Sequence, residues 1–105
     1  MSASEERVAR NEALFREFNE RVEGLAGDSP RIDFVCECGD LACLERLALT
    51  RTTYEQVRSD PRRFVVAPGH ENARIERVVA RGEGYFVVEK LEEAADVAIE
   101  HDPRS

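Results

Sequence analysis

The three cysteines of this chain lie within eight residues, in the segment Cys36-Glu-Cys38-Gly-Asp-Leu-Ala-Cys43. Zinc in proteins takes about four soft or borderline ligands in a tetrahedron, with Zn–S near ~2.3 Å and Zn–N near ~2.0 Å. Three thiolates and one imidazole satisfy those requirements. The spacing therefore predicts a Zn2+ site in which Cys36, Cys38 and Cys43 are ligands.

The spacing also constrains the local backbone. Cys36 and Cys38 are two residues apart, so in a straight strand they share one face, with Cα atoms about 6.5 Å apart. Both can reach one ion only if the chain bends at Cys38, and Gly39 permits such a bend. The next residues must then fold back to bring in Cys43, and their N–H groups can offset the charge of the thiolates.

The fourth ligand has three candidates: His70, His101 and Asp40. His70 follows Pro68-Gly69, a rigid residue and a permissive one, at the end of an apolar strand. His101 lies near the end of the sequence, where fraying is expected. Because a ligand must be pre-organised, we favour His70 and expect the metal set Cys36, Cys38, Cys43 and His70.

Two other interpretations of the cysteines remain open. Free cysteines often behave as small buried hydrophobes, which would suit Cys36 beside Phe34. Cys38 and Cys43 fall in expected turns, however, where a buried hydrophobe has little purpose. The thiols together with His70 could instead perform redox or nucleophilic chemistry.

Residues 3–26 are predicted to form the first helix, with Ser2 and Glu5 at capping-box spacing. A stripe recurs along it at helical intervals: Val8, Asn11, Phe15, Phe18, Val22 and Leu25. The first interpretation is that this stripe lies on the domain's own sheet. The second is a self-associating helix, since the stripe also fits a heptad with a polar residue at one seam position.

After Pro30 the spacing of apolar residues changes from the helical period to the period of two that is typical of strands. We expect strands near residues 32–38, 44–50, 64–67, 75–80 and 85–89, a short helix from about 52 to 60 and a final helix over 91–100; residues 73–81 could also be helical. Runs of strands without βαβ alternation favour an α+β fold. We expect one zinc-binding domain over residues 1–105, with a small, mostly antiparallel sheet, three helices and a zinc site that cross-links them.

Composition limits the partners. The chain has 15 basic and 22 acidic residues, a net charge of −7, and the excess of acid is spread along the whole sequence. A nucleic-acid-binding face needs concentrated positive charge, so we expect no nucleic acid as partner. There is no apolar run long enough for a membrane span and no signal-peptide pattern at residues 1–6. We therefore expect a cytoplasmic protein without membrane contact.

The sequence favours a non-enzymatic role. It contains no G-x-S-x-G, Walker A, G-x-G-x-x-G or H-E-x-x-H motif, and its carboxylates recur with the periodicity of a solvated surface. The leading hypothesis is a protein-interaction or regulatory module cross-linked by zinc. Its partner would be another protein or a second copy through the N-terminal helix. The alternative is a thiol- or zinc-based enzyme or redox sensor.

Several motifs resemble those of a group of small actinobacterial proteins with a C-x-C-G-D-x-x-C…P-G-H pattern. The matching segments are Phe34-Val-Cys-Glu-Cys-Gly-Asp, Ala42-Cys43-Leu-Glu-Arg, Tyr54-Glu-x-Val-Arg, Pro61-x-Arg-Phe-Val-Val-Ala-Pro-Gly-His70-Glu71, Tyr85-x-Val-Val-Glu-Lys90 and the helix Asn11-x-x-Leu-Phe-Arg-x-Phe-Asn-Glu-Arg. The resemblance implies that the cysteine and Pro-Gly-His motifs belong to one module. It implies no particular activity.

Overall fold

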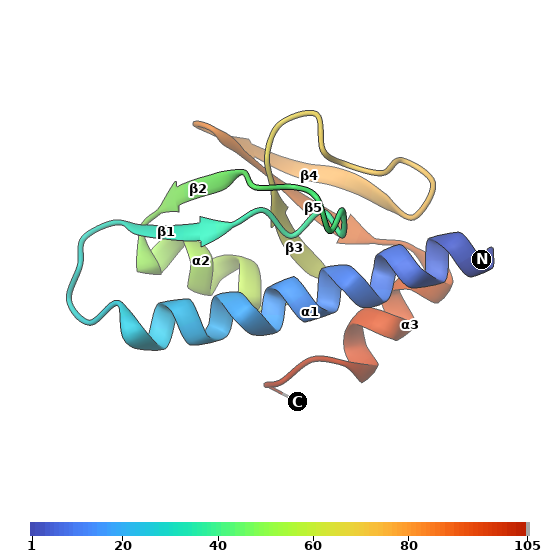
Figure 1. Ribbon diagram of the computed structural model, residues 1–105, viewed down its shortest axis with the longest axis horizontal. Coiled ribbons are helices and arrows are strands. Elements are labelled where there is room, and N and C mark those ends of the chain that lie inside the picture. Colours follow the sequence, from blue (N-terminus) through green and yellow to red (C-terminus); the bar gives the residue numbers. More distant parts are fainter. Residues whose placement is uncertain (105) are drawn as a thin grey trace.

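The computed structural model describes residues 1–104 and has an α+β architecture (Figure 1). The elements are α1 (Ala3–Leu25), β1 (Ile32–Val35), β2 (Arg46–Leu49), α2 (Arg51–Arg58), β3 (Arg63–Val66), β4 (Glu76–Gly82), β5 (Tyr85–Lys90) and α3 (Glu92–Glu100). The predicted fold class and the order of helices and strands are confirmed. Within the described part of the chain, no helix is both long and apolar enough to cross a bilayer.

The strands form two small antiparallel sheets where the sequence suggested one. The first pairs β1 with β2, with Ile32 opposite Leu49. The second has the order β3-β5-β4, so β3 and β4 are its edges. Residues 76–82 are extended, and the helical alternative for 73–81 is wrong. The chain between β1 and β2 contains all three cysteines and folds as a loop, which is why both strands are shorter than expected.

Helix α1 begins as predicted but buries a different face. Ser2 accepts a hydrogen bond from the Glu5 N–H, and the Glu5 side chain accepts one from the Ser2 N–H. The buried residues of α1 are Ala9, Glu12, Ala13, Arg16, Asn19 and Glu23. The first interpretation of the apolar stripe holds only in part, since Val8, Phe15 and Val22 are half-buried whereas Phe18 and Leu25 are exposed. Groups on other elements bind polar side chains of this buried side: Arg16 donates to the Pro61 and Ala98 carbonyls, and Asn19 donates to the Val35 carbonyl. A sequence pattern does not reveal such partners.

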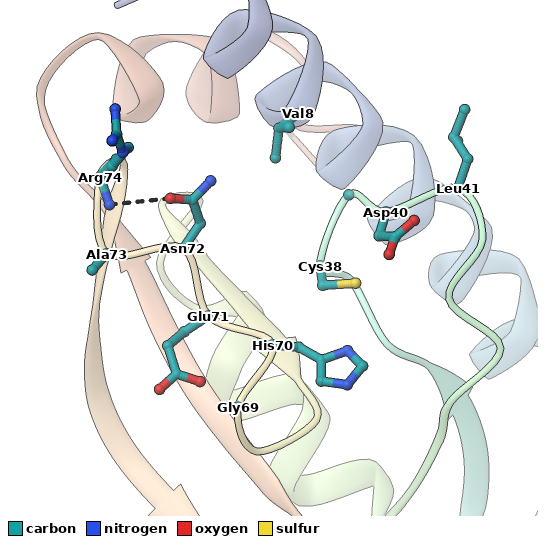
Figure 2. Close-up of a pocket in the computed structure, with 11 residues that line it drawn as sticks. Val8, Cys38, Asp40, Leu41, Gly69, His70, Glu71, Asn72, Ala73 and Arg74 are labelled. Carbon is teal, nitrogen blue, oxygen red and sulfur yellow. Dashed lines mark hydrogen bonds between the residues drawn. The ribbon is translucent and has the colours of Figure 1, made fainter.

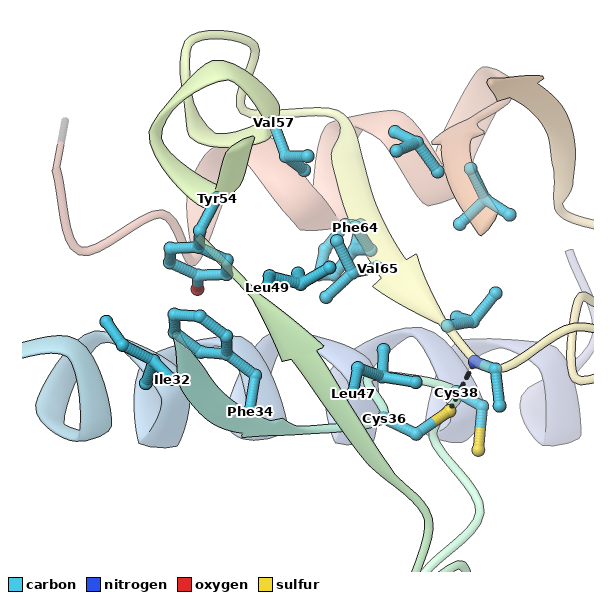
Figure 3. Close-up of a cluster of buried hydrophobic side chains, with 14 of the residues drawn as sticks. Ile32, Phe34, Cys36, Cys38, Leu47, Leu49, Tyr54, Val57, Phe64 and Val65 are labelled. Atoms are coloured by element: carbon cyan, nitrogen blue, oxygen red, sulfur yellow. Dashed lines mark hydrogen bonds between the residues drawn. The ribbon is translucent and has the colours of Figure 1, made fainter. Parts of the chain in front are cut away.

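The core lies between the two sheets and α2 (Figure 3). Phe34 of β1 stacks on Tyr54 of α2, with ring centroids 4.1 Å apart. Phe64 and Val65 of β3 are completely buried in the same cluster. Helix α2 begins one residue before the expected start, because Thr50 caps it by accepting a hydrogen bond from the Thr53 N–H. The two sheets thus share one core, and their ends come together at the cysteine loop.

Candidate metal centre

Cys36, Cys38, Cys43 and His70 converge at one point. One ligand atom from each residue can be chosen so that all four lie within 4.8 Å of one another. The Nδ1 atom of His70 is 3.5 Å from Cys43 Sγ and 3.7 Å from Cys36 Sγ. The cysteines follow β1 and His70 follows β3, so two loops that face each other supply the group (Figure 2). The arrangement could hold a metal ion.

Gly39 makes the bend that the cysteine spacing requires. Its φ is +80°, in the left-handed region that favours glycine. It also lies against α1, since a Cβ at this position would be 2.7 Å from the Val8 carbonyl oxygen. The Asn11 side chain donates a hydrogen bond to the Gly39 carbonyl at 3.1 Å. Helix α1 therefore packs against the bend and stabilises it. The next turn is closed by a hydrogen bond from the Cys43 N–H to the Asp40 carbonyl at 3.0 Å.

Ala67, directly after β3, connects the two halves of the site. Its N–H donates to Cys36 Sγ at 3.1 Å (Figure 3). Its carbonyl accepts the His70 N–H at 2.9 Å, which closes the turn through Pro68 and Gly69. Gly69 has a φ of +89°, so the expected role of the Pro-Gly pair in shaping this turn is confirmed. Ala67 therefore positions both the Cys36 thiol and the turn that carries His70.

Burial raises the pKa values of two of the thiols. For Cys36 the loss of solvent outweighs the hydrogen bond from the Ala67 N–H, which favours the thiolate. For Cys38 burial is again the largest cause, and the Asp40 N–H opposes it. Without metal, both groups are therefore protonated near neutral pH. Metal binding must release these protons, so metal affinity is expected to increase with pH.

The other two candidate ligands lie elsewhere. The Asp40 carboxylate accepts the Ala42 N–H at 2.9 Å, so it shapes the cysteine turn. His101 is at the C-terminal cap of α3 and lines a different pocket with Arg10 and Glu17. Neither joins the cluster in residues 1–104. The structure brings His70 to the cysteines as expected, whereas metal binding by the four residues stays a prediction.

Glu37 is a site residue that the sequence analysis missed. It lies between two metal-ligand candidates and is completely buried. Its carboxylate accepts hydrogen bonds from the Val65 N–H at 2.9 Å, from Asn19 Nδ2 at 2.8 Å and from the Tyr54 hydroxyl at 3.3 Å. Burial raises its pKa, and the hydrogen bonds from Asn19 and the Val65 N–H oppose that rise. Strand alternation gives no signal for it, because β1 ends at Val35 and Glu37 lies in the loop that follows.

A second buried group of charges supports the histidine loop. The Lys90 ammonium contacts the carboxylates of Glu12 and Glu76, and all three side chains are buried. Burial raises the pKa of Glu12, which the Lys90 charge opposes. The second oxygen of Glu76 accepts the Asn72 N–H at 3.0 Å. The expectation that the carboxylates lie on the surface is therefore wrong for several glutamates, whose partners come from distant parts of the chain.

An open depression of about 920 Å3 adjoins the cluster (Figure 2). Cys38, Asp40 and His70 line one part of it, and Glu71 and Arg74 line another. In Figure 2 the Glu71 side chain points away from His70. The depression gives solvent access to the histidine side of the cluster, while Cys36 on the other side is buried.

Comparisons with protein-family models, with curated proteins and with solved structures found no match to this chain. The chemistry of the site is therefore inferred from its own residues.

Proposed function

We propose that Cys36, Cys38, Cys43 and His70 bind one Zn2+ in a closed, structural site. The observation that carries this proposal is the convergence of three sulfur atoms and one imidazole nitrogen within 4.8 Å. Three thiolates and an imidazole suit zinc in both charge and softness. With four protein ligands the tetrahedron is complete, which is typical of structural sites and leaves no position for a substrate.

A structural role fits the position of the cluster in the fold. The cysteine loop extends from the sheet of β1 and β2, and the histidine turn extends from the sheet of β3, β4 and β5. A metal held by both loops would cross-link the two sheets. In a domain of this size, free energy from metal binding adds directly to the free energy of folding.

The state of the thiols supports a structural site over a redox or nucleophilic one. Reactive cysteines have lowered pKa values, because neighbouring positive charges or helix N-termini stabilise the thiolate. Burial instead raises the pKa values of Cys36 and Cys38. These two cysteines are suited to binding a metal that displaces their protons.

We further propose that the domain is an interaction module and that α1 carries its contact surface. Leu14, Phe18 and Leu25 are 58%, 50% and 87% exposed. With Arg21 they recur at intervals of four, three and four residues, so they share one side of the helix. Beside them, an apolar pocket of about 400 Å3 lies between α1 and Val35. We call Leu14, Phe18, Arg21 and Leu25 the α1 stripe; this set differs from the apolar stripe described in the sequence analysis and shares only Phe18 and Leu25 with it.

The occupant that we propose for this surface is a second copy of the chain. If two α1 helices pack antiparallel about an axis between Asn19 and Glu20, Leu14 of one copy faces Leu25 of the other. Phe18 then faces Arg21 of the other copy, an arrangement that permits a cation–π contact. The α1 stripe is therefore complementary to itself, as a two-fold interface requires.

Elemental analysis of protein purified without added metal tests the zinc proposal. We expect one zinc per chain and three thiols that react with a thiol reagent slowly until a chelator is added. Folded, metal-free protein whose three thiols react at once, and which does not take up added zinc, would contradict it.

A further inference from the structure

Glu37 holds the cysteine loop against the edge of β3. Its carboxylate accepts the Val65 N–H at 2.9 Å, and its own N–H donates to the Val65 carbonyl, also at 2.9 Å. The two bonds to one residue bring the loop onto β3, which is an edge strand of its sheet. A side chain thus supplies one of the two contacts that a neighbouring strand would provide.

This contact sets the register of the metal centre. Two residues after Val65, the Ala67 N–H donates to Cys36 Sγ and the Ala67 carbonyl accepts the His70 N–H. A shift of the loop along β3 would move Cys36 away from Ala67 and hence from His70. The relative position of the thiol and the imidazole therefore depends on the pairing of Glu37 with Val65.

We propose that Glu37 is a positioning residue for the metal centre, which sets metal affinity by fixing the Cys36–Cys38 segment relative to His70. The inference rests on the proposed zinc site and deepens it. Glu37 does not touch the ligand atoms. Asn19 Nδ2 and the Tyr54 hydroxyl also donate hydrogen bonds to its carboxylate.

The burial of this group indicates a specific role. A carboxylate moved from water into a core is costly unless hydrogen bonds satisfy it. An apolar residue would fill the same space without that cost, but it would not bond to the backbone of β3. The donors around Glu37 come from α1, α2 and β3, so the carboxylate fixes the segment against three elements at once.

The test compares metal affinity with fold stability in matched variants. Glu37→Gln keeps the size of the side chain, but only one oxygen remains to accept hydrogen bonds that the two carboxylate oxygens now share. Tyr54→Phe removes only the weakest donor and preserves the aromatic ring. Val88→Ala is the control, since it truncates a buried core residue whose sheet neighbours are Phe64 and Val78. The zinc Kd is measured by competition with a chromophoric chelator. Cobalt absorption spectra report thiolate number and geometry.

We expect Glu37→Gln to weaken zinc binding by about 10–100-fold, the usual effect of losing a group that orients a ligand, and to alter the cobalt spectrum. Tyr54→Phe should weaken binding less. Val88→Ala should lower the melting temperature without changing the Kd, because destabilisation affects Kd only when much of the metal-free protein is unfolded. If Glu37→Gln does not fold without metal, the comparison of Tyr54→Phe with Val88→Ala decides.

Unchanged affinity and cobalt spectra in the folded Glu37→Gln variant would overturn this inference and leave the zinc site intact. If Glu37→Gln does not fold without metal, an unchanged zinc affinity of Tyr54→Phe would overturn the inference in the same way. A wild-type protein that binds no zinc would overturn the proposed function and this inference with it. The two failures are therefore distinguishable.

Discussion

The side chain of Asn19 hydrogen-bonds to both backbone groups of Val35. Its Nδ2 donates to the Val35 carbonyl at 2.9 Å, and its Oδ1 accepts the Val35 N–H at 2.9 Å. An amide of α1 thus occupies the place of a neighbouring strand at the open edge of β1. The same Nδ2 donates to Glu37 at 2.8 Å. Helix α1 therefore fixes the segment that leads directly into Cys36.

Replacing His70 should remove metal and stability together. We expect His70→Ala to weaken zinc binding at least tenfold, since even loss of a group that only orients a ligand costs about 10–100-fold. The melting temperature of the zinc-loaded protein should decrease as well. His101→Ala is the control and should change neither quantity. Loss of zinc from His101→Ala, with retention by His70→Ala, would show that the ligand assignment is wrong. Retention by both variants would favour a site open to solvent or closed by another residue.

Gly39→Ala should disrupt the cysteine loop. The substitution places a Cβ at a positive φ and 2.7 Å from the Val8 carbonyl, so we expect a loss of more than ~1 kcal/mol in the free energy of unfolding. Zinc affinity should also fall. Gly24→Ala is the matched control, because a Cβ there meets open space in α1 and alanine should stabilise the helix by roughly 0.5–1 kcal/mol. Urea unfolding measures the free energy of unfolding of both variants. Equal changes in Gly39→Ala and Gly24→Ala would argue against a strained bend at Gly39.

Asp102 should contribute stability that disappears in acid. Burial raises its pKa, but hydrogen bonds from the Arg104 N–H and the Arg58 guanidinium outweigh burial and lower it overall. A lowered folded-state pKa stabilises the protein above about pH 4, the pKa of an unfolded aspartate, and this contribution is lost as pH falls through the folded value.

Asp102→Asn should therefore cost roughly 1.5–3 kcal/mol at pH 7 and progressively less as the pH falls below about 4, as measured by urea unfolding. Asp28→Asn, in the exposed loop after α1, is the control and should have little effect at either pH. A cost for Asp102→Asn that is independent of pH would contradict the assignment.

Phe18→Glu should abolish self-association through the α1 stripe. The residue is half exposed in one chain, so the substitution should leave folding intact while placing a charge in the proposed interface. Sedimentation equilibrium at up to about 1 mM detects association as weak as roughly −4 kcal/mol. We expect a dimer for the wild type and a monomer for the variant. Ile99→Glu, an exposed apolar position on α3, should still dimerise, and a monomeric wild type at every concentration would rule out this interface.

Local patterns in the sequence determined much of this protein. Periodicity predicted the three helices and most of the strands, because a helix or strand repeats a face at its own interval, but it left residues 73–81 undecided between strand and helix. The Ser2–Glu5 capping box and the bend at Gly39 were predictable because each depends on a few adjacent residues. The set of Cys36, Cys38, Cys43 and His70 was predictable because few residue types provide soft metal ligands.

The tertiary structure alone decided which face of α1 is buried and where the glutamates lie. Glu12 and Asn19 resemble surface residues in the sequence, but each is completely buried beside a polar group contributed by another element. Lys90 meets Glu12 from 78 positions away along the chain. A buried charge is stable only when such a partner is present, and the partner is brought close by folding. No periodicity in the sequence could therefore indicate that Glu37 points into the core, with donors on α1, α2 and β3 to hold it there.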